Sequence, residues 1–250
     1  MSHHDHGIGS SAWVIIILVL ITSSTALGEI GRDDLAVDGT ADKIIQRMME
    51  SNEKRARSLQ HYTEERHYQV EYSGFPHTSA ASMNVEATYD APSSKSFRVL
   101  SQTGSKRLID HVLKKLLVSE KEAAKNPSQT ALSPENYTFH FEGTEVIADQ
   151  KLYIFRVKPR VSRKFLYRGK IWVDAKDYAV ARIEAEPAQN PSFWIKKIEI
   201  HHLYSKSGDF WLPKRNSSET KTRTGGTAIL TIDYGEYHIK VANPRQLPLE

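Results

Sequence analysis

The chain has 250 residues, a formal net charge of +4, 39% hydrophobic residues and 26% charged residues. This composition is average for a globular protein and excludes a multi-spanning membrane protein, a collagen-like fibre and a wholly disordered chain. The sequence has no cysteine. Disulfide frameworks, thiolate metal sites, cysteine nucleophiles and a cysteine-linked lipid anchor are therefore excluded. The small excess of positive charge is only a weak argument for an anionic partner.

An apolar run covers residues 13–21, near the N-terminal end of the sequence. A spanning helix needs about 20 such residues, so this run is too short to cross a bilayer as a regular helix. Small residues, Ala26 and Gly28, follow it at the positions that a signal peptidase reads. We therefore predict that residues 1–28 are a signal peptide and that residues 29–250 form a single domain.

No Lys or Arg precedes the apolar run. Because a signal peptide normally begins with positive charge, an uncleaved N-terminal anchor is the alternative. The tract His3, His4 and His6 could bind a metal, but it leaves with the signal peptide, so no metal site is predicted.

The first helix is expected after a short tether over residues 29–39. Thr40 is placed as its N-terminal cap, and Asp42 in the first turn suits the helix dipole. The apolar residues Ile44, Ile45, Met48 and Met49 then recur at helical spacing. This pattern predicts an amphipathic helix that packs on another layer.

A second helix is predicted over residues 106–124, and the Asn126-Pro127 pair ends it. Its apolar positions form one stripe: Leu108, Ile109, Val112, Leu113, Leu116 and Leu117. The stretch from there to Pro134 is expected to be a loop.

Most of the remaining chain alternates between apolar and polar residues, as half-buried strands do. The predicted strands are 60–73, 82–90, 95–103, 136–146, 151–159, 164–174, 178–186, 193–206, 209–219 and 226–240. Short turns between them predict an antiparallel meander. The expected fold is mainly β (α+β): a large curved antiparallel sheet that forms an incomplete barrel, covered by two or three helices.

One face of this sheet is predicted to be apolar. Successive strands give rows such as Tyr153/Phe155/Val157 and Ala181/Ile183/Ala185. Two helices are too few to cover such a face, which indicates an apolar cavity beneath them. Its predicted lining is Tyr153, Phe155, Phe165, Tyr167, Ile171, Val173 and Ile183. The alternative is that the sheet curls tightly and fills its own interior.

Catalytic signatures are missing from the sequence: it has no nucleophile elbow, phosphate-binding loop or metal-binding His-Glu-x-x-His helix. His201 and His202 are adjacent on a predicted strand and so point to opposite faces. Asp174, Asp177 and Asp209 could converge as a carboxylate site. The first two are better explained as residues of a tight turn. No catalytic residue and no cofactor are predicted.

A basic stretch covers residues 156–170, which include no acidic residue. Arg160, Arg163 and Lys164 are predicted to form a patch for anionic headgroups. The alternative is a solvated hairpin whose charges prevent edge-to-edge aggregation.

Several short motifs resemble the LolA/LolB-type lipoprotein carriers and the related RseB-type sensor domains. They are residues 171–175 (IWVDA) followed by 179–184 (AVARIE), then 208–213 (GDFWLP), and the closing strand 226–237. The resemblance covers roughly residues 165–240. It implies an incomplete barrel whose helices form a lid over a hydrophobic cavity for acyl chains, in a bacterial periplasm. The long helix over 106–124 departs from those smaller carriers, and no individual cargo contact is transferred.

These observations together predict a non-enzymatic periplasmic carrier or sensor that binds lipid or lipoprotein acyl chains, as in outer-membrane lipoprotein sorting. Its expected partners are acyl chains and envelope membrane proteins or an anionic membrane surface. Nucleic acid is not expected as a partner, and the protein is expected to be a monomer. The alternatives are an exported hydrolase that uses Asp174, Asp177 and Asp209, and an envelope interaction module that binds no lipid.

Overall fold

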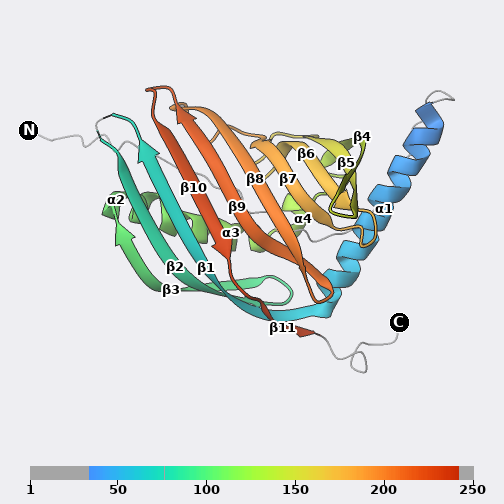
Figure 1. Ribbon diagram of the computed structural model, residues 1–250, viewed down its shortest axis with the longest axis horizontal. Helices are drawn as coiled ribbons and strands as arrows, with labels where there is room; N and C mark the ends of the chain where they lie inside the picture. The colour runs from blue at the N-terminus through green and yellow to red at the C-terminus, as the bar shows by residue number, and fades with distance from the viewer. Residues whose placement is uncertain (1–33, 76, 242–250) are drawn as a thin grey trace, which may run out of the picture.

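The structure is a computed structural model that describes residues 34–75 and 77–241 (Figure 1). The described residues form one open antiparallel sheet of eleven strands with helices on a single face. This confirms the predicted fold class. The predicted signal peptide, residues 1–28, lies outside the described residues.

Along the chain, α1 precedes a first run of three strands, and the segment from α2 to α4 precedes a second run of eight strands among the described residues. The helical segments are α1 (Asp34–Ser58), α2 (Lys106–Leu108), the π-helical turn η1 (Ile109–Leu113), α3 (Lys114–Ala124) and α4 (Pro127–Thr130). The strands are β1 (Leu59–Ser73), β2 (Ser79–Asp90), β3 (Ser94–Gly104), β4 (Tyr137–Ile147), β5 (Gln150–Pro159), β6 (Tyr167–Asp174), β7 (Val180–Pro187), β8 (Ile195–Ser207), β9 (Phe210–Thr222), β10 (Thr227–Tyr234) and β11 (His238–Val241).

The first helix begins earlier than predicted. It starts at Asp34, so Gly39 and Thr40 lie inside it and Thr40 is not its cap. Thr is a weak helix former that often caps, but the Leu and Ala at positions 35 and 36 of the sequence are good helix formers, so the helix extends upstream of Thr40. The expected tether over 29–39 is therefore helical from Asp34 onward.

The second helical segment has the predicted extent. α2, η1 and α3 run continuously from Lys106 to Ala124, and the Ser105 hydroxyl caps the start by accepting from the Leu108 N–H at 3.4 Å. The predicted apolar stripe faces the sheet, since Ile109, Leu113 and Leu116 are buried.

The sheet is a meander whose first strand, β1, lies in the interior of the sheet and not at an edge. The strand order is β3-β2-β1-β10-β9-β8-β7-β6-β5-β4, and β11 pairs with the start of β1. Consecutive strands pair as predicted, with two exceptions: β3 and β4 lie at opposite edges, and β10 and β11 both pair with β1 and not with each other. The segment between β3 and β4 is long and helical, so it carries the chain across the sheet from one edge to the other. The last predicted strand, 226–240, is split into β10 and β11 at residues 235–237.

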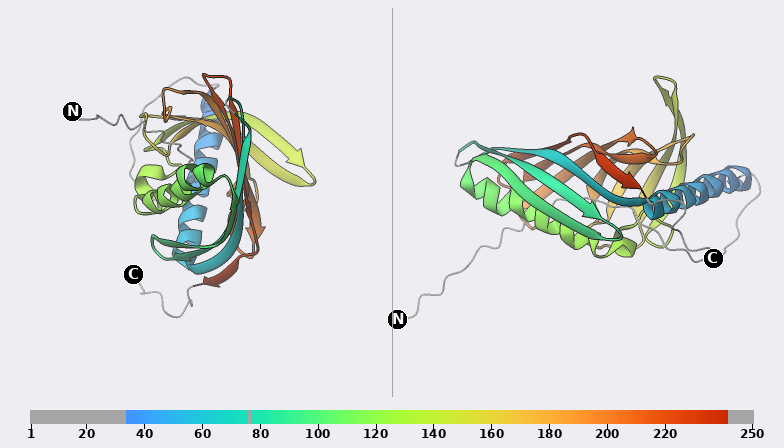
Figure 2. Two further views of the ribbon diagram at one scale, coloured as in Figure 1. Left: turned by 90° about the vertical axis from the view of Figure 1, so that its left-hand side faces the viewer. Right: turned by 90° about the horizontal axis from the view of Figure 1, so that it is seen from below.

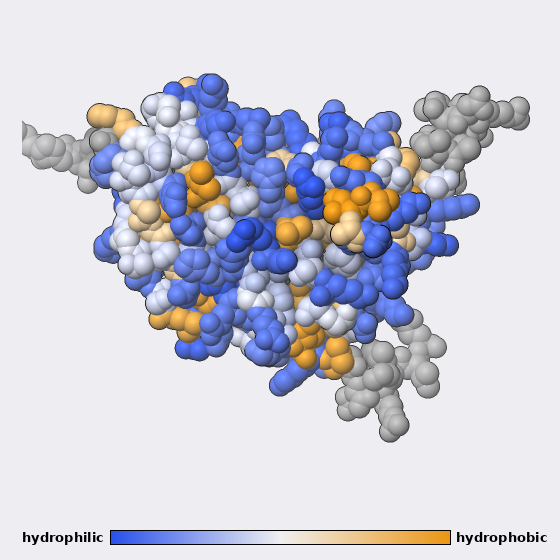
Figure 3. Space-filling view, viewed as in Figure 1, coloured by the Kyte–Doolittle hydropathy of each residue, from blue (hydrophilic) through white to orange (hydrophobic). Residues whose placement is uncertain are grey.

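Both long helices lie inside the curve of the sheet (Figure 2). α1 covers the half built from β4–β8, where Ile44, Ile45 and Met48 pack in a buried cluster with strand residues. α3 covers the half built from β1, β2 and β10, where Leu113 and Leu116 pack in a second cluster. The opposite face of the sheet carries no helix, and Figure 3 shows it as mostly hydrophilic with a few apolar patches. The concave face is thus divided between two helix-covered cores.

Candidate functional site

A pocket of about 130 Å³ lies between the two helix-covered cores. Residues from the end of α1, the start of β1, the loop after α4, and strands β2, β3, β7, β8, β9 and β10 border it, together with Glu120 of α3. An engineered apolar cavity of roughly 150 Å³ holds one benzene molecule. The pocket as it stands therefore has room for a small ring or a few methylene groups.

One of the predicted cavity residues, Ile183, lines this pocket. Four others, Phe155, Tyr167, Ile171 and Val173, are buried in the core beneath α1, and Tyr153 is partly buried against it. Several further aromatic rings fill the same space: Tyr137, Phe139, Phe141 and Tyr178. Beneath α1 these residues pack against one another in a buried core, and the pocket lies farther toward β1 and β9.

Two predicted inward positions are wrong. Phe165 precedes β6 with a φ of 73°, the centre of its ring lies 4.6 Å from Nζ of Lys164, and it is not a member of the core clusters. Ala181 faces the helix-free side with Leu152 and Trp172. The register of β6 against β7 shifts between Trp172 and Val173, and this bulge turns Ala181 to the opposite face.

The side chains that border the pocket are of two kinds, and we group them by their chemistry into an apolar half and a polar half. The apolar half contains Ala56, Leu59, Leu132, Ala179, Val180, Ile183, Phe210 and Leu212. The polar half contains Tyr62, Arg66, Tyr89, Lys95, Glu120 and Tyr234, together with Asn52 and Arg55 of α1. A mixed lining of this kind suits a ligand that has both apolar and polar groups.

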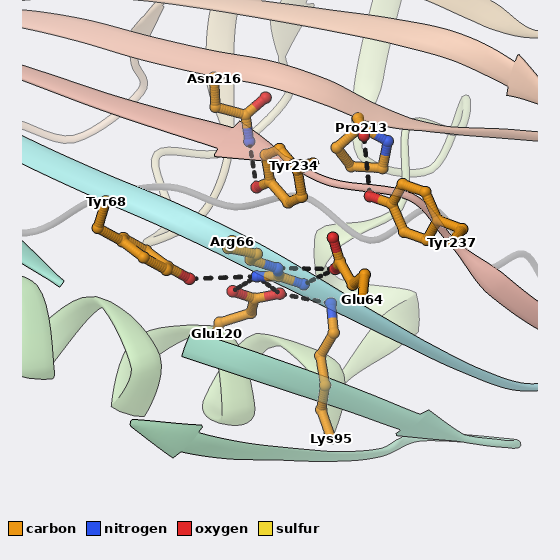
Figure 4. Close-up of polar contacts among 9 residues, drawn as sticks. All are labelled: Glu64, Arg66, Tyr68, Lys95, Glu120, Pro213, Asn216, Tyr234 and Tyr237. Carbon is orange, nitrogen blue, oxygen red and sulfur yellow. Dashed lines mark hydrogen bonds and ion pairs between the residues drawn. The ribbon is translucent and has the colours of Figure 1, made fainter. Parts of the chain in front are cut away.

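The polar half is built on a buried cluster of four charged side chains, Glu64, Arg66, Lys95 and Glu120 (Figure 4). The Arg66 guanidinium donates from Nη1 to both oxygens of Glu120, at 3.0 and 2.8 Å, and from Nε to Oε1 of Glu64 at 2.7 Å. Nζ of Lys95 donates to Oε1 of Glu120. All four side chains are at most 3% exposed. We call these four residues the ion cluster.

Aromatic side chains enclose the ion cluster. The Arg66 guanidinium lies 4.7 Å from the ring centre of Tyr234 and 5.5 Å from that of Phe97, and Nη1 also donates to the Tyr68 hydroxyl at 3.2 Å. Nζ of Lys95 lies 5.8 Å from the ring centre of Tyr62. These rings exclude water and add cation–π attraction, which strengthens the ion pairs.

Protonation in the cluster follows from burial and from neighbouring charge. Burial alone would raise the pKa of Glu120, but the charges of Arg66 and Lys95 outweigh it, so the pKa lies below its usual value. Burial raises the pKa of Glu64, although Arg66 opposes the change. Burial would lower the pKa of Lys95, but Glu120 raises it above its usual value. Glu120, Arg66 and Lys95 are therefore ionised at neutral pH.

The sequence analysis did not single out the ion cluster. Charged residues on a strand normally lie on its wet face, so the residue types of Glu64 and Arg66 do not by themselves indicate burial. The sequence feature that could have located the cluster is the alternation along β1. Tyr62, Tyr68 and Val70 lie on the same face of β1 as Glu64 and Arg66, and all five residues are buried. Two charges inside an apolar row indicate a paired, buried cluster.

The turn between β6 and β7 anchors α1 to the sheet. Nη1 of Arg55 donates to the carbonyl of Asp177 at 2.9 Å, and Nη1 of Arg47 donates to the Tyr178 hydroxyl at 2.9 Å. Oδ1 of Asp174 accepts from the backbone N–H groups of Lys176 and Asp177, at 3.0 and 2.6 Å. The turn interpretation of Asp174 and Asp177 is therefore confirmed.

The third carboxylate of the hydrolase alternative, Asp209, lies exposed in the turn between β8 and β9. Oδ2 of Asp177 accepts from Nζ of Lys206 at 2.7 Å and from Nε1 of Trp211 at 2.8 Å. These bonds hold the two turns together at one end of the sheet. Asp177 thus has a positioning role beside the pocket, because Trp211 also borders it.

His201 and His202 point to opposite faces, as predicted. His201 is exposed, whereas His202 is 4% exposed on the concave face, and its Nδ1 has no hydrogen-bond partner among the described residues. Burial, with a smaller contribution from the charge of His201, lowers the pKa of His202 from 6.5 to about 4. The imidazole is therefore neutral in the folded protein at neutral pH.

The lowered pKa of His202 predicts a loss of stability in mild acid. As the pH falls from about 6.5 to about 4, the unfolded chain binds a proton that folded His202 does not bind. The unfolding free energy should therefore fall by roughly 3 kcal/mol over this range from this residue alone. Urea unfolding between pH 7 and pH 4.5 should show a smaller loss for His202→Leu than for the parent. His201→Leu is the matched control and should keep most of the parental slope, because burial is the larger cause of the lowered pKa of His202. An unchanged slope in His202→Leu would contradict the assignment.

The predicted headgroup residues lie in the loop between β5 and β6. Nε of Arg160 donates to the carbonyl of Pro134 at 2.6 Å, and Nζ of Lys164 pairs with Oε2 of Glu122 at 2.6 Å. Arg163 is exposed in the same loop. Two of the three charges are thus partly engaged within the protein, and their binding to anionic headgroups stays a prediction.

Exposed aromatic residues lie beside this loop. Phe193 and Trp194, 74% and 58% exposed, sit in the turn before β8, where Nε of Arg223 donates to the carbonyl of Phe193 at 2.7 Å. The loops are joined by backbone bonds, from Ala188 N–H to Leu166 and from Arg223 N–H to Trp194, both 2.8 Å. We call the loops 160–166, 188–194 and 223–226 the basic rim, because they contain basic and aromatic residues but no acidic ones.

Two features are missing from the described residues. No helix there has the length and hydropathy needed to span a bilayer. Within the same residues, no group of three or more His, Asp or Glu side chains is placed to hold a metal ion.

The geometry defines a class of protein: an open antiparallel sheet whose concave face holds two helices and, between them, a pocket with one apolar and one polar half. A family model described as "Family of unknown function (DUF5686)" matches residues 128–237, from α4 to the turn after β10. The sequence matches no curated protein.

Solved structures of low sequence identity are similar to this chain. A DUF1329 family protein from Desulfovibrio piger has 10% identity and a TM-score of 0.40, over 80% of this chain and 92% of that one. A LolA superfamily protein from Nitrosomonas europaea has 11% identity and a TM-score of 0.37, over 82% and 96%. A domain assigned to outer membrane lipoprotein sorting, from Vibrio parahaemolyticus, has 13% identity and a TM-score of 0.40, over 84% and 95%. The LolA superfamily, which the motifs in residues 165–240 resemble, is thus among them.

Proposed function

We propose that this protein is a non-enzymatic carrier or sensor of the bacterial periplasm that binds acyl chains of lipids or lipoproteins. The observation that carries the proposal is the partly apolar pocket between α1 and α3 on the concave face of an open sheet. The motif resemblance of residues 165–240 supports the same class of function and the same compartment.

The size of the pocket determines how a chain would bind. Each buried methylene contributes about 0.8 kcal/mol, so the few that fit into about 130 Å³ give weak, reversible binding. A longer chain needs α1 to move away from the sheet. The contacts that resist this movement are the buried side chains of Ile44, Ile45 and Met48 and the hydrogen bonds of Arg47 and Arg55 to the β6–β7 turn. Cargo binding is therefore coupled to displacement of α1.

An anionic membrane surface is part of the proposal as a partner. The basic rim joins exposed Phe193 and Trp194 to Arg163 and Arg223. Aromatic rings are favoured at the membrane interface, and basic side chains are attracted to anionic headgroups. The rim lies at the end of β6 and β7 opposite to Ala179 and Val180, which border the pocket. Docking at the rim would leave the pocket unobstructed.

The proposal is tested by native mass spectrometry of protein purified from its own envelope fraction. The parent is expected to carry bound lipid. Ala56→Trp fills the apolar half of the pocket from α1 and should lose this lipid while keeping the parental circular dichroism spectrum. Ile229→Trp adds the same bulk at an exposed position on β10 and should keep the lipid.

Two results would contradict the proposal. One is a folded parent that carries no lipid and takes up none from vesicles, which would favour an interaction module without lipid. The other is a folded Ala56→Trp variant that retains the parental amount of lipid, which would place the bound chain outside this pocket.

A further inference from the structure

A groove of about 520 Å³ lies over strands β5–β8 and shares no lining residue with the pocket between the helices. A row of residues that lie opposite one another on these four strands, Arg156, Lys170, Glu184 and His201, borders it. Side chains of residues directly opposite each other share a face of the sheet, and His201 is exposed on the helix-free face. The groove therefore faces away from both helices.

The β5–β6 side of the groove carries an excess of positive charge. Arg156 and Lys170 share one carboxylate, Glu142 of β4, with N–O distances of 2.5 and 2.7 Å. Lys158 and Arg168 are neighbours across the same two strands, one residue beyond the last pair of that ladder, and neither has a carboxylate partner within the described residues. Like charges side by side destabilise a sheet, and an anion bound between them would remove this repulsion.

The excess of positive charge continues beyond the groove. Arg168 also borders an adjoining hollow of about 90 Å³, where its Nη2 donates to the carbonyl of Pro187 at 3.5 Å. Lys196 of β8 borders the same hollow and is exposed, again without a carboxylate partner in the part of the chain that the structure describes. Three exposed cations, Lys158, Arg168 and Lys196, thus lie along one path across the helix-free face.

The carboxylates on the β7–β8 side limit the kind of anion that fits this path. Glu186 and Glu199 share one cation, Lys197, at 3.6 and 2.6 Å, so negative charge is in excess there. A polymer with a charge on every unit, or a continuous anionic surface, would place negative charge against these carboxylates as well.

An extended polypeptide avoids this repulsion. Its side chains alternate between two faces, so acidic residues at every second position lie about 7 Å apart with uncharged residues between them. Four strands span about 14 Å, which four or five extended residues cover. Such a segment can place its carboxylates at the free cations and its uncharged residues at Glu186 and Glu199.

We propose that the groove over β5–β8 binds an extended acidic segment of a partner protein, whose carboxylates pair with Lys158, Arg168 and Lys196. The inference does not depend on what occupies the pocket, and it adds a protein partner to the proposed carrier or sensor. Because the groove lies on the face opposite α1, the partner can stay bound while α1 moves.

Fluorescence anisotropy of labelled peptides with the full chain at neutral pH tests the inference. The probe is the acetylated peptide amide Thr-Glu-Val-Glu-Val-Glu-Thr, and its comparison peptide has glutamine in place of each glutamate. The glutamate peptide should bind at least about tenfold more tightly, because only its side chains form charge-assisted hydrogen bonds with the free cations.

The groove variant combines Lys158→Gln with Arg168→Gln and should weaken binding of the glutamate peptide at least about tenfold. Its matched control combines Lys115→Gln with Lys125→Gln, which removes the same charge from exposed positions on and just after α3 and should keep most of the parental affinity. The groove variant should melt at or above the parental temperature, since it loses a pair of neighbouring like charges, and this shows that the proteins compared are folded.

Three results would overturn the inference. The first is a parent that does not bind the glutamate peptide, and the second is equal weakening by the groove variant and its control, which would reduce the effect to net charge. The third is a groove variant that binds the peptide as the parent does but loses binding to heparin or to phosphatidylglycerol vesicles, which would assign the groove to a polyanion or a membrane. Lipid bound in the pocket is measured separately by native mass spectrometry, so each of these results leaves the proposed function standing.

Discussion

Replacing Glu120 with Ala is expected to lower the unfolding free energy by about 3–5 kcal/mol, because it leaves Arg66 and Lys95 buried without their shared counter-ion. Glu120 is also the one residue of α3 in the ion cluster, so its loss detaches the helix from β1 and β3 at this point. For a domain of this size the melting temperature should fall by roughly 10 °C. Urea unfolding with circular dichroism gives the free energy directly.

The matched control is Asp110→Ala in η1. Asp110 also joins two cations, Lys106 and Lys114, but this pair of bridges is largely exposed. Exposed ion pairs contribute little to stability, so this variant should unfold near the parental midpoint. Equal losses for the two variants would show that the cluster around Glu120 is open to water, contrary to its burial here.

Replacing Ile171 with Glu is expected to prevent folding. The Ile171 side chain is fully buried on β6, opposite Ile183 of β7 and Phe155 of β5, in the core beneath α1. A carboxylate there has no cation within the core cluster, and its burial costs several kcal/mol, comparable to the whole stability of a domain. The expected result is loss of soluble protein, or a circular dichroism spectrum without the strand signal.

Ile229→Glu is the control for this substitution, because Ile229 lies on an exposed position of β10 and should accept a charge with little effect. A folded Ile171→Glu variant that has lost only acyl-chain binding would show that the space beneath α1 is a water-accessible cavity. In that case the filled core described here would be wrong.

Local alternation was sufficient to locate nearly every strand. Each predicted strand has a counterpart in the sheet, because one face of the sheet is covered by helices and the other meets solvent, so burial imposes a period of two. Alternation failed where the backbone departs from that period. The bulge in β7 between Val180 and Arg182 turned Ala181 outward, and Phe165, with its positive φ, precedes β6 and is not part of it.

The candidate site was less accessible to sequence analysis than the fold was. A cavity between two helices and a curved sheet could be expected from the shortage of covering surface, but its position depends on where the helices lie. α1 lies over β4–β8 and α3 over β1, β2 and β10, and no local pattern specifies this choice. Pairing of Lys95 with Glu120 joins residues from two different elements, so the ion cluster becomes visible only in three dimensions.

The pairing of β1 with β10 has a consequence for how the molecule is made. Arg66 of β1 lies opposite Tyr234 of β10 in the centre of the sheet. β1 can therefore be paired on both sides only after β10, nearly the last strand of the chain, has been made. A chain synthesised from its N-terminus therefore first forms two partial sheets, β1–β3 and β4–β9, each with an unprotected edge. Their union depends on contacts very distant in sequence, which form slowly. A chain truncated before Thr227 would keep both edges exposed and should aggregate.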